Sequence, residues 1–235
     1  MTTMKFGITD SFNCSYLEDQ EERLLVYAGD GLSQKTDYEY LLGSGFRRSG
    51  DQVYRPHCPN CSACRSLRIA VADFSPSKNQ KRVVSKNRDI TYHTSIENKP
   101  EYFALYHRYI SERHADGSMF PPTSEQYQGF LNDDWTNTLY VELRLENKLV
   151  AVAVTDAMQN CLSALYTFFD PDLAHRSLGT LAILEQINQA HLLGKRYLYL
   201  GYQIDSCQKM NYKSKFLPNE QFIDHQWIRF QKNDD

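Results

Sequence analysis

The sequence predicts an α+β protein with two parts, a small amino-terminal α/β domain over residues 1–90 and a carboxy-terminal mixed-sheet domain over residues 91–235. Two observations predict this division. The first part holds a cluster of cysteines and basic residues among short apolar runs broken by Gly and Pro, whereas regular alternating runs from residue 139 onward precede a long amphipathic segment. A chain of 235 residues is also long enough for one large or two small cores.

Three short elements are expected in the amino-terminal part. A helix is predicted from Thr36, a good capping residue, to Leu42, just before two glycines. Residues 46–54 are predicted to form a hairpin because Ser-Gly-Asp lies at their centre. Residues 66–74 alternate apolar and polar side chains, as a half-buried strand does.

The middle of the chain, residues 77–130, is predicted to be mainly helical and polar. One helix is expected to start after Ser75-Pro76 and to spread five basic side chains over its surface: Lys78, Lys81, Arg82, Lys86 and Arg88. A second helix is predicted from Pro100 to Arg113. Its apolar residues recur at three- and four-residue spacing, so that face should pack against the core.

The carboxy-terminal part has the clearest pattern. Three strands joined by short turns predict an antiparallel meander, which is followed by an amphipathic helix, a short strand and a closing strand. The predicted segments are residues 139–145, 149–155, 161–169, 178–193, 197–200 and 222–230.

This order of meander, loop, helix and strand is that of acyltransferases of the acetyltransferase type, so the second domain is predicted to be acetyltransferase-like (GNAT). In those enzymes a loop with the pattern Arg/Gln-x-x-Gly-x-Gly/Ala holds a pyrophosphate on free amides at the helix start. Here Arg176 and Gly179 match the pattern, but Leu181 replaces the final small residue. The sequence therefore disfavours the usual recognition of coenzyme A.

How the cysteines are interpreted depends on the cellular compartment of the protein. The first 25 residues carry several acidic residues and no apolar signal segment, and no apolar run approaches the roughly 18 residues that span a bilayer. A soluble, cytoplasmic protein is therefore expected. In a reducing compartment Cys58, Cys61 and Cys64 should be thiols or metal ligands rather than disulfides. Cys161 is expected to be a small buried apolar residue.

Positive charge is concentrated around the same cysteines. Residues 47–88 hold ten Lys or Arg against two Asp, a net charge of +8, although the whole chain has a net charge of −3. A local positive field steers a polyanionic partner more effectively than overall charge does. RNA is the expected partner, and neither DNA nor a membrane is.

A second polar segment follows the short strand near residue 200. It places Tyr199, Tyr202, Asp205, Lys209, Tyr212 and Lys213 in an expected loop and helix start. Ligands commonly bind beyond the carboxyl ends of strands in open sheets. Two interpretations stay open, a ligand-binding segment and a solvated basic loop that its tyrosines hold to the core.

Several motifs occur in an order that resembles a known family. They are Cys14-Ser-Tyr, Gly45-Phe-Arg47-Arg48-Ser-Gly50, Tyr54-Arg-Pro, Cys58-Pro-Asn-Cys61-Ser-Ala-Cys64, Ser177-Leu-Gly179-Thr and Tyr202-Gln-Ile-Asp-Ser-Cys-Gln-Lys209-Met-Asn-Tyr-Lys213. From about residue 10 to residue 225 the chain resembles the arginyl-tRNA–protein transferase family, and more closely its bacterial leucyltransferase branch.

The resemblance implies an enzyme that takes leucine from leucyl-tRNA and joins it to the amino-terminal Asp or Glu of a protein, which marks that protein for degradation by the N-degron pathway. Transfer is expected to need no cofactor. Eukaryotic relatives carry a metal or iron–sulfur centre on paired cysteines, a pattern that this chain lacks. Cys14, Cys58, Cys61 and Cys64 would still complete a tetrahedral zinc or four-iron site, with His57 as the substitute for Cys14.

The implied chemistry is aminolysis of an ester. An amino-terminal amine has a pKa of about 7.7 to 8.0 and is partly neutral near pH 7, so a strong side-chain base is not required. Near-attack positioning lowers the barrier by roughly 7 to 11 kcal/mol, and oxyanion donors add about 3 kcal/mol. Tyr202 or the amides after Ser177 are expected to be such donors, and Asp205 or a water is expected to accept the proton.

The binding residues are assigned by charge. An acidic acceptor side chain favours a guanidinium, so the acceptor candidates are Arg47, Arg48 and Arg55, with Arg176 as a further one, although each arginine equally suits a phosphate. The expected aminoacyl-tRNA site comprises Arg176, Ser177, Leu178, Gly179, Thr180, Lys81, Arg82, Lys209 and Lys213. Tyr166, Phe168 and Phe169 either form the wall of a leucyl pocket or simply pack in the core.

Three other functions remain open from the sequence. The first is an arginyltransferase with the same acceptors, and the second is a coenzyme A-dependent N-acetyltransferase. The third is a zinc-knuckle RNA-binding protein without catalytic turnover, which would leave the meander, helix and strand order unexplained.

Overall fold

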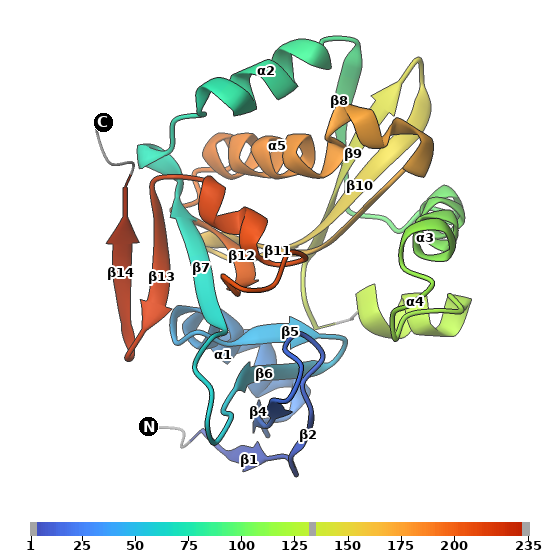
Figure 1. Ribbon diagram of the computed structural model, residues 1–235. Coiled ribbons are helices and arrows are strands. Elements are labelled where there is room, and N and C mark those ends of the chain that lie inside the picture. The colour runs from blue at the N-terminus through green and yellow to red at the C-terminus, as the bar shows by residue number, and fades with distance from the viewer. Residues whose placement is uncertain (1–3, 132–134, 232–235) are drawn as a thin grey trace.

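The computed structural model describes residues 4–131 and 135–231, in which one large sheet, one smaller sheet and a two-stranded ribbon are accompanied by five helices (Figure 1). The helices are α1 (Gly31–Gly43), α2 (Lys78–Lys86), α3 (Pro100–Arg113), α4 (Ser124–Leu131) and α5 (Leu178–Leu192). The strands are β1 (Phe6–Ile8), β2 (Phe12–Asn13), β3 (Glu21–Glu22), β4 (Leu24–Tyr27), β5 (Arg47–Ser49), β6 (Gln52–Pro56), β7 (Arg65–Ala70), β8 (Ile90–Ser95), β9 (Thr138–Leu145), β10 (Lys148–Ala157), β11 (Cys161–Phe169), β12 (Tyr197–Gln203), β13 (Asn219–Ile223) and β14 (Gln226–Phe230).

The large sheet is mixed and has the strand order β14-β13-β7-β12-β11-β10-β9-β8. Its central strand β10 is buried on both faces. Ala151 and Ala153 pack with α5, whereas Val152 and Val154 pack with α3 and α4 on the opposite face. Strand side chains alternate between the two faces, so helices must cover both sides of this sheet. Figure 1 shows α2 lying over α5 on one side and α3 with α4 on the other.

The predicted meander and the elements after it are confirmed. Strands β9, β10 and β11 pair antiparallel in sequence, α5 follows, and β12 returns parallel to β11. This is the acetyltransferase-like arrangement that the sequence predicted. Helices α3 and α5 also lie where their apolar periodicity placed them. In α3 the buried face is shifted, because Tyr106 and Ile110 are buried as expected but His107 is exposed, and Tyr102, Leu105 and Tyr109 are buried with them.

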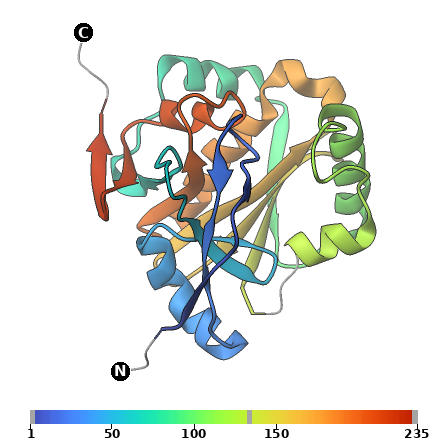
Figure 2. The ribbon, with the colours of Figure 1, turned by 60° about the horizontal axis from the view of Figure 1, so that its bottom comes forward.

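The smaller sheet, of order β1-β4-β6-β5, packs with α1 against one end of the large sheet. Figure 2 shows these strands lying across the large sheet rather than continuing it. Their shared apolar cluster includes Tyr38 and Leu42 of α1 together with Cys161 and Tyr199 of the large sheet. Cys161 is 2% exposed, as expected for a small buried thiol.

Strand β7 ties the two expected domains together. It pairs with β12 on one side and β13 on the other, so residues 65–70 belong to the large sheet. Helix α2 also packs against α5. The division at residue 90 expected from composition would therefore cut through the large sheet, and we propose a boundary near residue 64 instead.

Three elements differ from the expectation. Residues 222–230 were predicted to be a single strand but form the end of β13, a turn and β14. Asp224 and His225 both have positive φ angles, of 49° and 63°, as a two-residue hairpin turn of this twist requires. Strand β8 and helix α4 lie in the middle region expected to be helical, and β8 was not predicted. None of the helices in residues 4–131 and 135–231 is long and apolar enough to cross a membrane.

Candidate active site between two separating strands

The candidate site lies where β11 and β12 separate. These parallel strands pair only between Cys161–Ser163 and Tyr197–Tyr199, and the register ends there. The β10–β11 pairing shifts register between Val154 and Thr155, where Leu165 of β11 is the extra residue. The β12–β7 pairing shifts between Tyr199 and Gly201, where Leu200 of β12 is the extra residue. A bulge redirects a strand and ends regular pairing, so the central sheet leaves backbone groups of β11 open to other partners.

Arg47 of the smaller sheet fills the start of this opening. Its Nη1 donates to Ser163 Oγ at 2.8 Å and its Nη2 to the Ala164 carbonyl at 2.5 Å. The side chain faces Gly201, where an added Cβ would lie 3.2 Å from the guanidinium nitrogens. Gly201 also has a φ of +85°. A glycine is required here both for the backbone conformation and for the approach of Arg47.

Lys213 is the second cation at this place. It lies in the short 3-10 helix η3 (Asn211–Lys215), is only 7% exposed and donates from Nζ to the Tyr202 carbonyl at 2.5 Å. Burial, and to a lesser extent the nearby Arg47, lower the pKa of Lys213 to about 7. The sequence placed Lys213 in the aminoacyl-tRNA site, whereas its ammonium is buried and faces a protein carbonyl in the structure.

Four tyrosines from separate segments form a group that includes Tyr212, whose ring lies beside Lys213. They are Tyr16 in the β2–β3 connection, Tyr109 of α3, Tyr166 of β11 and Tyr212 of η3. Tyr109 and Tyr166 have ring centroids 6.5 Å apart. The pKa of Tyr166 is raised, first by burial and then by Tyr109, Tyr106, Tyr212 and Tyr16. Tyr16 and Tyr212 are 40% and 41% exposed, so the group reaches the surface.

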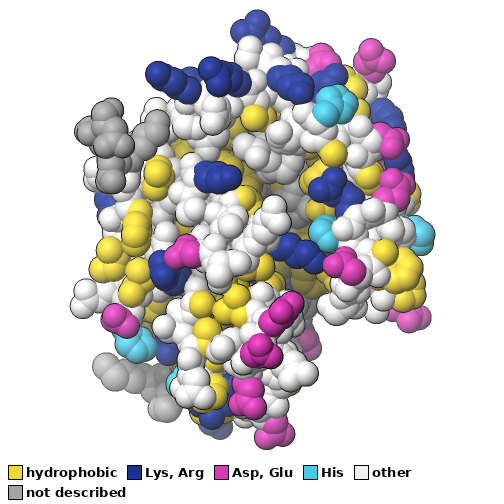
Figure 3. Space-filling view, viewed as in Figure 1, with side chains coloured by type: hydrophobic (Ala, Val, Ile, Leu, Met, Phe, Trp, Pro, Cys, Tyr) yellow, Lys and Arg dark blue, Asp and Glu magenta, His cyan; other side chains and the backbone are white. Residues whose placement is uncertain are grey.

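Figure 3 shows the face that carries these segments. The surface is hollowed near its centre, and Lys, Arg and His side chains lie beside the hollow. A row of basic side chains also lines the upper edge, where Figure 1 places α2. The face therefore combines an apolar hollow with a separate basic edge.

Tyr202, the first predicted catalytic residue, contacts the smaller sheet through its hydroxyl. Its hydroxyl is buried and lies 3.2 Å from the Gly45 carbonyl and 3.1 Å from the Tyr54 carbonyl. Burial raises its pKa well above the usual value. These contacts hold β12 to the smaller sheet, and the role of Tyr202 as an oxyanion donor stays a prediction.

The second predicted catalytic residue, Asp205, lies on the surface beyond β12. Its carboxylate accepts from Gln203 Nε2 at 3.0 Å and pairs with Arg65 at 3.2 Å, while its side chain stays 64% exposed. The charge of Asp205 is therefore shared with Arg65, and the structure does not bring it into contact with Arg47 or Lys213 by any ion pair or hydrogen bond among the described residues.

A large cleft of about 1290 Å³ opens on the side of the cysteine loop. It is lined by the β2–β3 connection, residues 55–66 and the β13–β14 turn, with Tyr202 at its inner wall. Arg55, one of the expected acceptor residues, lines this cleft, and its Nη1 donates to the Ser44 carbonyl at 3.2 Å. Arg55 thus remains exposed to a ligand in the cleft.

The four cysteines expected to bind metal do come together. Cys14, Cys58, Cys61 and Cys64 line one small cavity of about 30 Å³. However, no group of three or more His, Cys, Asp or Glu side chains in the described part of the chain has an arrangement that could hold a metal ion. Burial and then the other three thiols raise the pKa of Cys64 to about 12 when no metal is present. The expected zinc or iron–sulfur site therefore does not fit this arrangement.

Arg48 is excluded from acceptor binding by its position. Its Nε and Nη2 form a bidentate pair with Asp156 at 3.0 and 2.7 Å, and both side chains are fully buried. Nη1 donates to the Gly50 carbonyl at 3.0 Å, and Tyr38 donates to the same Asp156. Arg48 therefore links the smaller sheet to β10 and cannot reach a substrate.

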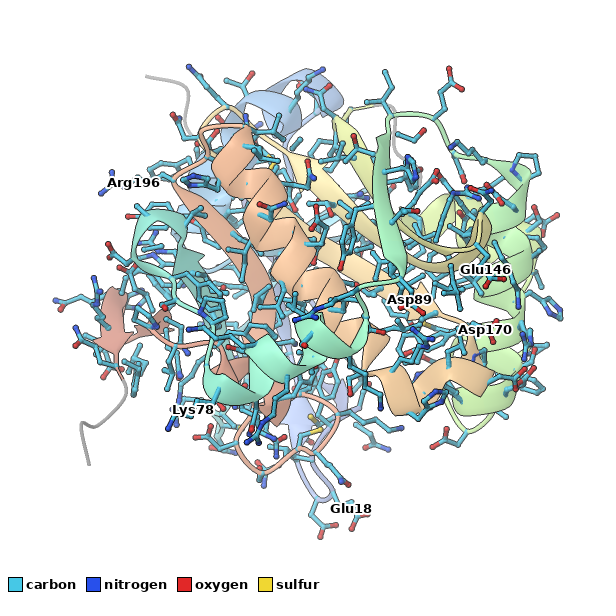
Figure 4. All side chains as sticks on the ribbon, turned by 90° about the horizontal axis from the view of Figure 1, so that it is seen from above. Glu18, Lys78, Asp89, Glu146, Asp170 and Arg196 are labelled. Carbon is cyan, nitrogen blue, oxygen red and sulfur yellow. The ribbon has the colours of Figure 1, made fainter. Side chains whose placement is uncertain are left out.

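The loop before α5 is held by the basic helix above it. Arg176 pairs with Asp89 at 2.9 and 3.0 Å, and Asn87 Nδ2 donates to the Arg176 carbonyl at 3.0 Å. Ser177 has a positive φ of 57° and Leu178 is fully buried, so neither Arg176 nor Leu178 is a free ligand-binding side chain. Figure 4, from above, shows α2 across α5 with Lys78 and Asp89 at opposite ends.

The surface residues expected to contact tRNA fall into two places. Lys78, Lys81, Arg82, Lys86 and Arg88 are exposed along and just after α2. The Ser77 side chain caps this helix together with Gln80, which fixes its start and hence its exposed face. Lys209 lies apart from α2 and pairs with Asp116, both side chains being exposed.

Comparisons with known proteins decide the family. The model "Arginine-tRNA-protein transferase, N terminus" matches residues 12–82 and the model "Arginine-tRNA-protein transferase, C terminus" matches residues 101–223. The chain belongs to the arginine-tRNA-protein transferase family. The two matches cover the cysteine loop, Arg47, β11, β12 and Lys213.

Two curated relatives extend the match over almost the whole chain. An aspartate/glutamate leucyltransferase of Pseudoalteromonas atlantica is 57% identical over 98% of this chain and 100% of the relative. One of Aeromonas salmonicida is 52% identical over 95% of this chain and 94% of the relative. A conserved protein of unknown function from Bacteroides thetaiotaomicron has a similar fold, with a TM-score of 0.53 and 11% identity over 84% of this chain and 79% of that one.

Sequence reasoning missed Tyr109 and the partner of Arg47, and it named Tyr16 only as part of the Cys14-Ser-Tyr motif. Tyr16 and Tyr109 lie far from β11 in the chain, so only the fold brings them to Tyr166 and Tyr212. The one available signal was the combination of Tyr212-Lys213 with Gly201, a glycine in an otherwise apolar strand. Such a glycine indicates a bulge or the close approach of another group, and here that group is Arg47.

Proposed function

We propose that this chain is an aminoacyltransferase that moves leucine from leucyl-tRNA to the amino-terminal Asp or Glu of acceptor proteins. The observation that carries the proposal is the identity of 57% and 52% to aspartate/glutamate leucyltransferases over nearly their full length. The acetyltransferase-like sheet supports it, because the separation of β11 and β12 opens a place where an acyl ester and an amine can meet.

The distribution of charge supports a division of the surface. The α2 helix would bind the tRNA backbone, since its four basic side chains and Arg88 just after it are exposed and phosphate contacts need no deep pocket. Lys81 and Arg82 are the central members of this surface, and Lys209 would extend it. The loop of Ser177, Gly179 and Thr180 would face the acceptor end of the tRNA.

The reaction itself needs positioning more than acid–base chemistry. The ester is activated, and the amine of the acceptor is partly neutral near pH 7. Holding the two groups in contact in the hollow supplies the main rate enhancement. We place the reaction in the cytoplasm and its product in the N-degron pathway, with no cofactor taking part in transfer.

The test is a transfer assay with defined substrates. tRNA charged with labelled leucine or arginine would be offered to peptides that differ only in a first residue of Asp, Glu, Asn or Ala. We expect label on Asp- and Glu-peptides from leucyl-tRNA only. Transfer of arginine instead would establish the arginyl donor, and acetylation of the same peptides from acetyl-coenzyme A without transfer from either tRNA would overturn the proposal.

A further inference from the structure

Two buried cations meet at the start of the opening between β11 and β12. Arg47 is 6% exposed and Lys213 is 7% exposed. Their head groups lie at adjacent residues of β12, because the Arg47 guanidinium approaches Gly201 and Lys213 Nζ donates to the Tyr202 carbonyl. Within residues 4–131 and 135–231, neither forms an ion pair with an Asp or Glu side chain, and their hydrogen bonds go to uncharged acceptors of Ser163, Ala164, Tyr202 and Met210.

Other shielded arginines in this protein have an acidic partner. Arg48 pairs with Asp156, Arg68 with Glu220 and Arg144 with Glu142. Taking a charge out of water is costly unless an opposite charge accompanies it. Two adjacent cations without such a partner therefore form a site suited to an anionic ligand.

The pair is only one side chain below the surface. The Tyr212 ring lies 5.6 Å from Lys213 Nζ, and Arg47 also acts on the Tyr212 hydroxyl. Tyr212 is 41% exposed, so its outer side is in contact with solvent. Tyr212 is therefore the side chain that separates the two cations from solvent on this side.

The surroundings favour a ligand that has both a carboxylate and an ammonium group a few bonds apart. Tyr109 and Tyr166 border the same place, and aromatic faces attract an ammonium group. A phosphate of a tRNA backbone is flanked by riboses on both sides and suits the exposed basic face of α2 better than a site below a tyrosine. The amino-terminal residue of an acidic acceptor has both required groups, the carboxylate and the amine.

We propose that Arg47 and Lys213 together hold the side-chain carboxylate of the amino-terminal Asp or Glu. This carboxylate would enter the site past the side chain of Tyr212. This rests on the proposed transferase function and assigns its acceptor specificity. Lys213 is then a specificity-determining residue rather than a tRNA contact. Arg47 keeps the role expected from the sequence, but with a lysine as its partner in place of Arg48.

The test compares acceptors that differ by one charge. kcat/KM would be measured with saturating leucyl-tRNA for peptides that begin with Asp or the nearly isosteric Asn, using wild type, Lys213→Met and the control Lys215→Met. Lys215 is exposed in the same short helix. We expect the Asp-to-Asn ratio to fall at least about tenfold in Lys213→Met, mainly through KM for Asp, and to stay unchanged in Lys215→Met.

A second variant keeps the inference testable if Lys213→Met does not fold. Lys213→Arg retains the charge on a longer side chain, which leaves less room for the acceptor side chain. Because Glu is longer than Asp, the preference for Asp over Glu should rise by a few-fold. An unchanged Asp-to-Asn ratio in folded Lys213→Met, or an unchanged Asp-to-Glu ratio in Lys213→Arg, would overturn the inference. The transferase proposal would survive either result, because it fails only if the wild-type protein does not transfer leucine to Asp- or Glu-peptides.

Discussion

Adjacent arginines in one strand have different roles because their side chains meet different partners. Arg48 is neutralised by Asp156 and joins two sheets, whereas Arg47 donates only to neutral oxygens and lies beside Lys213. A charge with a buried partner supports the fold, and a charge without one is available to a ligand. The pattern Arg-Arg in the sequence does not distinguish these two cases.

Lys213 should make the stability of the protein depend on pH. Its pKa is about 7 in the fold against an ordinary value of 10.5, owing to burial and to Arg47 of β5, with Cys207 and Cys64 opposing. Between these values the unfolded chain binds more protons, so the free energy of unfolding should rise with pH. Urea unfolding at pH 7, 8 and 9 should show wild type gaining up to about 1.4 kcal/mol per pH unit over Lys213→Met. Parallel pH curves for the two proteins would contradict this.

Replacing only Arg48 should lower the free energy of unfolding more than replacing Arg48 and Asp156 together. Arg48→Met leaves a buried carboxylate without its cation and should lower the free energy of unfolding by about 3 to 5 kcal/mol. The double variant Arg48→Met/Asp156→Leu should recover part of that loss, since no charge remains buried. Denaturant unfolding of the wild type, Arg48→Met, Asp156→Leu and the double variant measures this, and a double variant that loses the full sum of both single changes would disagree.

At the scale of elements, the bulge in β12 creates the site. Strand β12 pairs with β11 over three residues and then bends at Gly201, which makes room for Arg47 from another sheet. Helix α2 contributes a different function. Its capping box sets the helix start and leaves its basic side chains toward solvent.

Gly201→Ala should reduce leucyl transfer more than Gly194→Ala does. Both glycines have positive φ angles, +85° and +65°, so both substitutions strain the backbone by about 1 to 3 kcal/mol. Only at Gly201 does the new Cβ meet Arg47, at 3.2 Å, while nothing lies within 4 Å at Gly194. Leucyl transfer to Asp-peptides should therefore drop in the Gly201 variant alone. Equal activity in the two variants would contradict a role of this contact.

Charge reversal on α2 should weaken leucyl-tRNA binding without altering acceptor choice. For Lys81→Glu/Arg82→Glu we expect about tenfold weaker binding at moderate salt. The plot of the logarithm of the binding constant against the logarithm of the salt concentration should have a slope shallower by about 1 for each phosphate that the variant no longer binds. Lys35→Glu, in α1 of the smaller sheet, is the matched control. Filter binding over a salt series provides the measurement, and an unchanged slope in the α2 variant would argue against this surface.

At the scale of the whole molecule, the two predicted domains are joined through several contacts. Strand β7 lies between β12 and β13, and Arg47, Arg48 and Tyr38 reach from the smaller sheet and α1 into β10 and β11. The site itself depends on this joint, because Arg47 comes from one part and Lys213 from the other.

Unfolding of the full chain should therefore be a single cooperative transition. Urea curves followed by far-ultraviolet circular dichroism and by tryptophan fluorescence should coincide, since both sheets share buried partners. A fragment of residues 91–235 lacks β7 and should not fold on its own. Two separate transitions, or a stable fragment, would instead support the boundary at residue 90.

Local pattern determined much of this protein from the sequence alone. Alternation and turns placed β9, β10 and β11, apolar periodicity placed α3 and α5, and the sharing of motifs indicated the transferase family. These features depend on neighbours in the chain, so the sequence contains them directly.

The tertiary structure alone decided which charges and hydroxyls are free. It paired Arg48 with Asp156, turned Tyr202 into a support between sheets, brought the four cysteines together without a metal-binding arrangement, and placed Lys213 beside Arg47. Each of these outcomes depends on residues far apart in the chain, whose burial and partners arise only when the sheets pack.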